Sequence, residues 1–426
     1  MNRVAACLLV GGMALCSGCR TSGSVPEKAP PPEKTTLVGS RWALPESLAD
    51  AVAKERLDTP LVPVTVNVAG ASYALQVPAA APPVVTAEPD GGTSLDVVLD
   101  DGVTGHCTGQ PGELRLGSLV LKAHRHLVDA AVGRRHVTSA ITPLEGLPSA
   151  ISVAWEYITD DDTYGAYRLL AGYSGPVAWA CTVDSPGHQA TLARLLGELM
   201  RGSLRGDEAT QRTYYAMTSG QGMRAIGVEE RVTQADQGAL ERDRVLFLRP
   251  ASGGLFISDY LQEETSNAGE AMVDMRIGSW VQGELNLDVK VHRADDGKLT
   301  VSGVREGKAM NGSVESLTFQ SAAQRRRVVR DLVERGHDAV MLDSLDLADD
   351  PEATPLAEVV REELVLIRRT DDWALLEATP QDGESNSVSL RWVDRHGDMI
   401  RSEWTRGSIR VVTEITWPPV PRLPPR

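Results

Sequence analysis

The chain has 426 residues and a mass of 45.8 kDa, with 42% hydrophobic and 24% charged residues. This composition is ordinary for a globular protein, and it excludes a wholly disordered chain and a polytopic membrane protein. The formal net charge of −15 argues against nucleic acid as the main partner, because nucleic-acid binding requires a basic surface. At roughly 150 residues per domain, the length predicts two or three domains.

The N-terminus has the pattern of an export signal. The basic start Met1-Asn2-Arg3 precedes an apolar stretch, Val4 to Leu15, that is shorter than the ~20 residues a membrane-spanning helix needs. The small residues Ser17 and Gly18 then precede Cys19. This run resembles the lipobox of bacterial lipoproteins, in which the cysteine is lipidated and becomes the mature N-terminus.

The resemblance implies a signal peptide at residues 1–18 and a lipid anchor on Cys19. Cys16 stands where that family usually has leucine. The alternatives are an uncleaved anchor and a soluble secretory signal, although an Ala-x-Ala cleavage site for the second is absent. The residue directly after Cys19 is Arg20. An aspartate at that position would resemble an inner-membrane retention signal, so the arginine makes the bacterial outer membrane the expected location. Residues 19–36 are rich in proline and are expected to form a semi-stiff tether.

Cysteine usage gives a second indication of the compartment. Of the five cysteines, Cys7 and Cys16 would leave with the signal peptide and Cys19 would carry lipid. Cys107 and Cys181 remain, and an even pair in an exported protein predicts a disulfide. Two separate buried thiols are the alternative, because the sequence does not give the separation of the two Cα atoms.

Residues 37–206 are expected to form an α+β domain built on an antiparallel sheet. Its helices are predicted from an N-cap at Ser118 to Gly133, and from Ser185 to about Gly202. The order of elements over residues 60–205 resembles the α-β-α sandwich of PsbP-like proteins. Strand patterns occur at residues 62–68, 73–77, 94–99, 151–158, 164–173 and 177–183.

Residues 214–417 are expected to form a β-rich domain with one helix, followed by a proline-rich tail at residues 418–426. A capping-box pattern begins the helix at Ser321 and Gly336 ends it. Long strands around one helix resemble the half-barrel of periplasmic lipoprotein carriers and sensors. The segment from Trp392 to Arg401 resembles a Trp-x-Asp-x-x-Gly-x-x-x-Arg hairpin of exported bacterial β-domains. Strand patterns occur at residues 228–232, 244–249, 255–257, 271–277 and 285–292, with a hairpin turn at Asp296-Gly297. Two further hairpins are predicted at residues 364–379, with a turn at 370–372, and at residues 388–405, with a turn at 396–398.

A search for catalytic or metal-binding patterns finds none that fits. Four histidines, His106, His124, His126 and His136, match no zinc motif and are expected on the solvated surface. The segment 172–176 departs from a nucleophile elbow, because proline replaces its second glycine, and it is expected to be a turn. The basic run 325–327 is expected to be a solvated helix face. No catalytic residue, metal or cofactor is therefore expected.

The sequence thus favours a non-enzymatic envelope lipoprotein that acts in binding or assembly. Its expected partners are the membrane, through the lipid anchor, and another envelope protein. One alternative is a carrier that holds an apolar ligand between the β-rich sheet and the helix at 321–335. Another is an enzyme whose site is assembled from scattered residues. A large apolar cavity would favour the carrier, and convergent polar side chains in a cleft would favour the enzyme.

Overall fold

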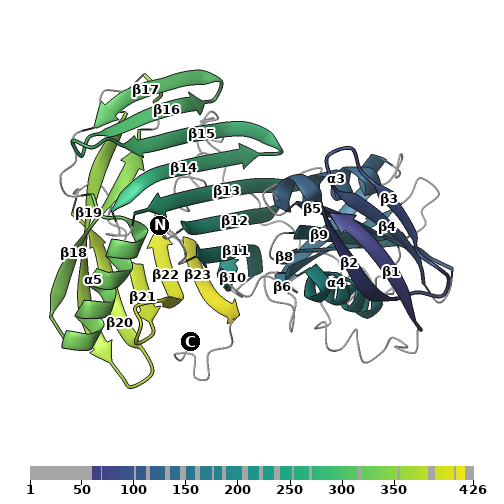
Figure 1. Ribbon diagram of the computed structural model, residues 1–426. Helices are drawn as coiled ribbons and strands as arrows, with labels where there is room; N and C mark the ends of the chain where they lie inside the picture. The colour runs from purple at the N-terminus through teal and green to yellow at the C-terminus, as the bar shows by residue number, and fades with distance from the viewer. Residues whose placement is uncertain are drawn as a thin grey trace, which may run out of the picture. The chain divides into compact units, whose positions relative to one another are not determined.

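The computed structural model shows an α+β fold in which antiparallel strands dominate (Figure 1). All described elements belong to one compact unit, Leu48–Arg426. The expected signal peptide, Cys19, the tether and the C-terminal tail lie outside the described residues. None of the described helices is long and apolar enough to cross a membrane. The structure describes residues 60–68, 70–99, 102–111, 116–129, 135–143, 150–158, 164–174, 177–184, 189–203, 210–219, 224–234, 240–251, 254–267, 271–314, 319–348, 350–352, 356–381, 389–406 and 409–417.

The N-terminal half contains a seven-stranded antiparallel sheet with the order β3-β4-β5-β9-β8-β7-β6. Two meanders, β3 to β5 and β6 to β9, join where β5 pairs with β9. Of the segment 172–176 that was expected to be a turn, residues 172–174 belong to β8, and residues 175 and 176 lie outside the described residues. The strands are β3 (Val84–Ala87), β4 (Thr93–Val98), β5 (Thr104–Pro111), β6 (Arg135–Pro143), β7 (Ala150–Ile158), β8 (Tyr164–Ser174) and β9 (Val177–Val183).

Helices and a hairpin cover both faces of this sheet. Helix α4 (Gln189–Ser203) and the hairpin of β1 (Leu61–Val68) and β2 (Ala71–Pro78) share one apolar cluster with one face. Helix α3 (Leu116–Asp129) shares another cluster with the opposite face. Because residues alternate between faces along a strand, β9 can be buried on both sides, and all seven of its residues are buried.

The C-terminal half is one fourteen-stranded antiparallel sheet with the order β17-β16-β15-β14-β13-β12-β11-β10-β23-β22-β21-β20-β19-β18. Two meanders, β10 to β17 and β18 to β23, join where β10 pairs with β23. The strands are β10 (Thr210–Ser219), β11 (Arg224–Gln234), β12 (Leu240–Ala251), β13 (Gly254–Ser266), β14 (Met272–Val281), β15 (Glu284–Arg293), β16 (Leu299–Arg305), β17 (Lys308–Val314), β18 (Ala339–Leu347), β19 (Ala357–Arg369), β20 (Ala374–Pro380), β21 (Ser389–Val393), β22 (Met399–Arg406) and β23 (Ile409–Trp417).

Helix α5 (Ala322–Arg335) connects the two meanders in the chain and forms as the sequence predicts. Ser321 and Gln324 make the capping box, and Gly336 ends the helix in the left-handed conformation. Val329, Leu332 and Val333 pack against an apolar cluster from β18 to β21. Figure 1 shows α5 lying against this part of the sheet.

The start of α3 differs from the prediction. Ser118 lies inside the helix and is not its N-cap. The backbone N–H of Gly117 instead donates a 2.8 Å hydrogen bond to the carboxylate of Asp259 on β13. The first N–H groups of a helix have no partner within the helix, and a side chain close in sequence usually accepts a hydrogen bond from one of them. Here the carboxylate of Asp259 is the acceptor. A partner 142 residues away cannot be recognised from a local sequence pattern, which explains the wrong prediction.

Candidate functional site

A group of buried charged side chains lies beneath the first turn of α5. We define the acid–arginine cluster as Glu241 and Asp243 on β12, Glu264 on β13, and Arg325 and Arg326 on α5. Glu241 and Glu264 are direct cross-strand partners, and Asp243 lies two residues further on the same face of β12. The three acidic residues are at most 7% exposed. Like charges opposite one another on a sheet are destabilising, so this arrangement needs counter-charges.

Helix α5 supplies those counter-charges. Arg326 Nη1 lies 2.7 Å from Glu241 Oε2, and Arg325 Nη2 lies 3.9 Å from Glu264 Oε2. The backbone N–H of Ala322 donates a 2.7 Å hydrogen bond to Glu264 Oε1. Glu264 therefore accepts a hydrogen bond from an N-terminal N–H of the helix, at the positive end of the helix dipole, which favours a carboxylate there. The cluster joins α5 to β12 and β13, while the apolar side of the helix packs on β18 to β21.

Burial dominates the electrostatics of Glu264. It raises the pKa of this carboxyl from 4.5 to about 7, against the lowering effects of Arg325 and of the Ala322 hydrogen bond. Glu241 and Asp243 raise the pKa further, because like charges disfavour ionisation. Oε2 of Glu264 is buried and makes no hydrogen bond among the described residues. Glu264 is thus a carboxyl group that changes its protonation state near neutral pH.

The expectation of a solvated basic face was wrong for Arg325 and Arg326. Both guanidinium groups are largely buried, and of the three arginines in the run only Arg327 is exposed. The helical period explains this, since positions 325 and 326 precede Val329 and follow Ala322 by three or four residues. These arginines lie on the stripe that faces the sheet. Helical spacing was the sequence signal that could have placed them there.

The hairpin of β21 and β22 brings its turn against α5. In this turn Asp394 Oδ1 accepts hydrogen bonds from the backbone N–H groups of His396 and Asp398. Gly397 has φ 81°, and a Cβ atom there would lie 2.9 Å from the backbone nitrogen of Arg330. The glycine therefore permits both the left-handed turn and the close approach of the helix. The aspartate and glycine of the hairpin pattern thus have structural roles.

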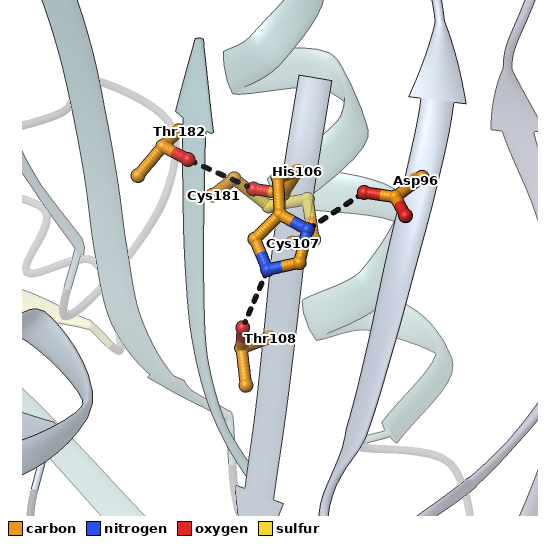
Figure 2. The surroundings of a disulfide bond; sticks show 6 residues. All are labelled: Asp96, His106, Cys107, Thr108, Cys181 and Thr182. Carbon is orange, nitrogen blue, oxygen red and sulfur yellow. Dashed lines mark hydrogen bonds and ion pairs between the residues drawn. A yellow bond between two sulfur atoms is a disulfide. The ribbon is translucent and has the colours of Figure 1, made fainter. Parts of the chain in front are cut away.

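Cys107 and Cys181 form the expected disulfide, which lies in the seven-stranded sheet. Cys107 on β5 and Cys181 on β9 are direct cross-strand partners, and their sulfur atoms are bonded (Figure 2). Both residues are fully buried in the cluster that α4 covers. The bond therefore joins the two meanders of the sheet at the place where β5 meets β9.

A polar network lies on the other face of β5. His106 Nδ1 is 2.7 Å from Asp96 Oδ1, and His106 Nε2 is 3.2 Å from Thr108 Oγ1, as Figure 2 shows. This order of groups is that of a nucleophile, base and orienting acid. However, Thr108 is 4% exposed, and β5 pairs with a strand on each side. Its backbone amides therefore belong to the sheet and form no oxyanion hole, so the network does not support nucleophilic catalysis.

Of the four histidines, His106 and His124 have described side chains, and these two have different hydrogen-bond partners. His124 is buried on α3, with Nδ1 2.6 Å from the hydroxyl oxygen of Tyr167, so its expected place on the surface was wrong. His124 follows the buried Val120 by one helical turn, which is why it faces the sheet. The side chains of His126 and His136 lie outside the described residues. Across the described ranges, no group of three histidine, cysteine or acidic side chains is placed to hold a metal ion.

No protein-family model and no curated protein matches the chain. A β-barrel-like protein of the domain of unknown function DUF1849 from Brucella abortus is 14% identical, with a TM-score of 0.39, over 49% of this chain and 96% of that chain. A DUF1089 family protein from Pseudomonas aeruginosa is also 14% identical, with a TM-score of 0.25, over 40% of this chain and 87% of that chain. Neither TM-score is high enough to carry an argument about function.

Proposed function

We propose that this protein is a bacterial envelope lipoprotein, anchored to the outer membrane through Cys19, whose folded body binds another envelope protein without catalysing a reaction. The observation that carries the proposal is the buried disulfide between Cys107 and Cys181. Disulfides of this kind persist in oxidising compartments and are rare in the bacterial cytosol. This agrees with the export signal and lipobox pattern of the first nineteen residues.

The proposal includes a half-barrel-like arrangement of the fourteen-stranded sheet around α5. Its support is that α5 contacts strands from distant places in the sheet order. The first turn of the helix reaches Glu264 on β13, and Leu332 packs against β18 to β20. A sheet whose separated strands contact one helix must bend around it.

Binding through the protein surface is favoured over an apolar carrier. The buried side chains of the cluster between α5 and β18 to β21 are at most 9% exposed, and the partly buried Val328, Val340 and Leu366 pack against them, so the described contact is filled by the protein itself. A carrier would need α5 to move away, which would leave Val329, Leu332 and Val333 in water. Exposure of such side chains costs roughly 1.5–3 kcal/mol each.

Metabolic labelling with an alkyne analogue of palmitate tests the anchor. Wild-type protein and a Cys7→Ala variant should carry the label, because Cys7 is removed with the signal peptide. Cys19→Ala should lose the label, since the thioether to diacylglycerol needs that sulfur. Undiminished label in Cys19→Ala would disprove the anchor.

Native mass spectrometry of the full-length protein tests binding against carriage. We expect the mass of the mature chain with its covalent lipid and an intact disulfide. A further apolar ligand bound once per chain, and retained in Cys19→Ala, would favour the carrier.

A further inference from the structure

The fourteen-stranded sheet ends in two edge strands, β17 and β18 (Figure 1). The edge of β18 is partly occupied by the residue before the N-cap of α5. The backbone N–H of Asp343 donates a 3.2 Å hydrogen bond to the side chain of Gln320, and its C=O accepts a 3.4 Å hydrogen bond from the Gln320 N–H. Among the described residues, nothing occupies the edge of β17 in this way.

The turn before β17 determines which backbone groups point to its open side. Glu306 and Gly307 both have positive φ, 49° and 77°, as in a two-residue type I′ turn, so the residues that flank them form a hydrogen-bonded pair. Such pairs alternate along an antiparallel ladder, so the even-numbered residues of β17 bond to β16. The N–H and C=O groups of Ala309, Asn311 and Ser313 therefore point away from β16 and have no partner among the described residues. We call these three residues the β17 edge.

The β17 edge lacks the features that usually prevent strand addition. Proteins protect exposed edges with charged side chains, proline, bulges or a covering segment. The three side chains of the β17 edge are exposed and uncharged, and β17 contains no proline and pairs with β16 without a register shift. The only charge of the strand is Lys308 at its start, which lies 3.5 Å from Glu352. The opposite residues on β16 are also uncharged: Thr300, Ser302 and Val304.

We propose that the β17 edge is a self-association surface, at which β17 of a second copy of this chain adds in the antiparallel direction with Asn311 opposite Asn311. In this register Ala309 of each copy lies opposite Ser313 of the other copy. Every outward N–H and C=O of the two edges is then paired, and the two fourteen-stranded sheets become one continuous sheet. The proposal goes beyond binding of another envelope protein and does not depend on the lipid anchor.

The side chains favour a second copy as the occupant, because a contact on a two-fold axis must be self-complementary. On one face the two Asn311 carboxamides meet at the axis. A carboxamide has both donors and an acceptor, so two identical ones can bond reciprocally. On the other face Met310 lies opposite Gly312 of the second copy, so a large side chain meets a residue that has none.

The charges of the chain do not oppose this contact. A net charge of −15 disfavours association through an acidic surface, but the β17 edge carries no acidic residue. The two Lys308–Glu352 pairs would lie at opposite ends of the paired strands, about 20 Å apart, since a strand rises about 3.3 Å per residue. One strand from each copy buries less than the roughly 800 Å² per partner of a standard interface, so we expect a reversible dimer.

Cysteine cross-linking of the full-length protein in detergent tests the register. Asn311→Cys places two thiols opposite one another, at the ~5.5 Å Cα separation that a disulfide can bridge, so mild oxidation should give a covalent dimer. Ser313→Cys is the matched control on the same edge. Its two thiols would be more than about 13 Å apart, so it should give at least tenfold less dimer. Wild type treated in the same way gives the background.

Exchange of charge at the centre of the edge tests the occupant. In sedimentation over a concentration series, Asn311→Lys and Asn311→Asp should each lose the dimer of the wild type, because like charges meet at the axis. A mixture of the two variants should recover it, which only pairing of Asn311 with Asn311 predicts. Ser302→Lys is the control, since Ser302 lies opposite Asn311 on β16 but not at the edge, and it should dimerise as wild type does.

Three outcomes would overturn the proposal. The first is a wild-type chain that remains monomeric at every concentration, and the second is equal cross-linking of Asn311→Cys and Ser313→Cys. The third is a mixture of Asn311→Lys and Asn311→Asp that stays monomeric, which would be expected if a strand of a different protein occupies the edge. Since Asn311 and Ser313 are exposed, these variants should keep the fold, and thermal unfolding checks that they do.

Discussion

Trp392 and Arg401 lie opposite one another on β21 and β22, and the guanidinium carbon of Arg401 is 4.9 Å from the centroid of the indole ring. Arg401 is 2% exposed and lies between the carboxylates of Glu403 and Glu414 on the same side of the sheet. The first and last residues of the hairpin pattern are therefore a stacked cation–π pair within a buried ion network. The cation–π pair and the turn at Asp394 and Gly397 give every fixed residue of the hairpin pattern a structural role.

The ion network around the buried Arg401 predicts a clear effect of removing this residue. Arg401→Ala should destabilise the protein by roughly 1–3 kcal/mol, because it removes the buried cation next to Glu403 and Glu414, while Glu403 keeps its ion pair with Arg410. Arg401→Lys keeps the charge but loses the planar stack, so it should cost less than Arg401→Ala and more than a surface substitution. Urea unfolding of the three proteins measures the order. Equal stability of wild type and Arg401→Ala would show that the network contributes nothing.

The close approach of Gly397 to α5 predicts a second effect. Gly397 and Gly297 lie in turns with the same backbone hydrogen bonds and have φ of 81° and 84°. A Cβ atom on Gly297 would meet no atom within 4 Å, whereas one on Gly397 would meet the backbone of α5. Gly297→Ala should therefore cost about 1–2 kcal/mol from the left-handed conformation alone.

Gly397→Ala should cost clearly more than Gly297→Ala, since the helix backbone must also shift. The difference between the two variants in thermal or urea unfolding isolates the contact with α5. If the two alanine variants are equally stable, the turn does not support the helix.

The raised pKa of Glu264 predicts how global stability depends on pH. Between pH 4.5 and about pH 7 the unfolded chain releases the proton of Glu264 while the folded protein keeps it, so stability falls as pH rises. The full loss is about 3 kcal/mol, because one pKa unit corresponds to about 1.4 kcal/mol. Glu264→Gln should remove this part of the pH dependence and be more stable than wild type at pH 8. Urea unfolding at pH 5 and pH 8 measures it, with Glu263→Gln as control.

Local sequence patterns predicted the elements that local interactions determine. The capping box and Gly336 gave both ends of α5, and Asp296-Gly297 gave the hairpin between β15 and β16. Strand β17 was not predicted, because its residues show little alternation of apolar and polar side chains. Only two of them are buried in the structure. The acid–arginine cluster could not be predicted, since its strands and helix are about 60 residues or more apart and no local pattern specifies their contact.

The contact between Gly117 and Asp259 gives the last prediction. Asp259→Ala should cost about 1–2 kcal/mol, because the N-terminal N–H of α3 loses its buried acceptor. Asp259→Asn retains an oxygen acceptor and loses only the favourable charge at the helix N-terminus, so it should cost about 1 kcal/mol or less. Gly117→Ala should be at least as damaging as Asp259→Ala, since its Cβ would overlap the carboxylate. Combining Gly117→Ala with Asp259→Ala should relieve this overlap, so the double variant should be more stable than the sum of the single effects predicts. Strict additivity in urea unfolding would show that the two residues do not interact.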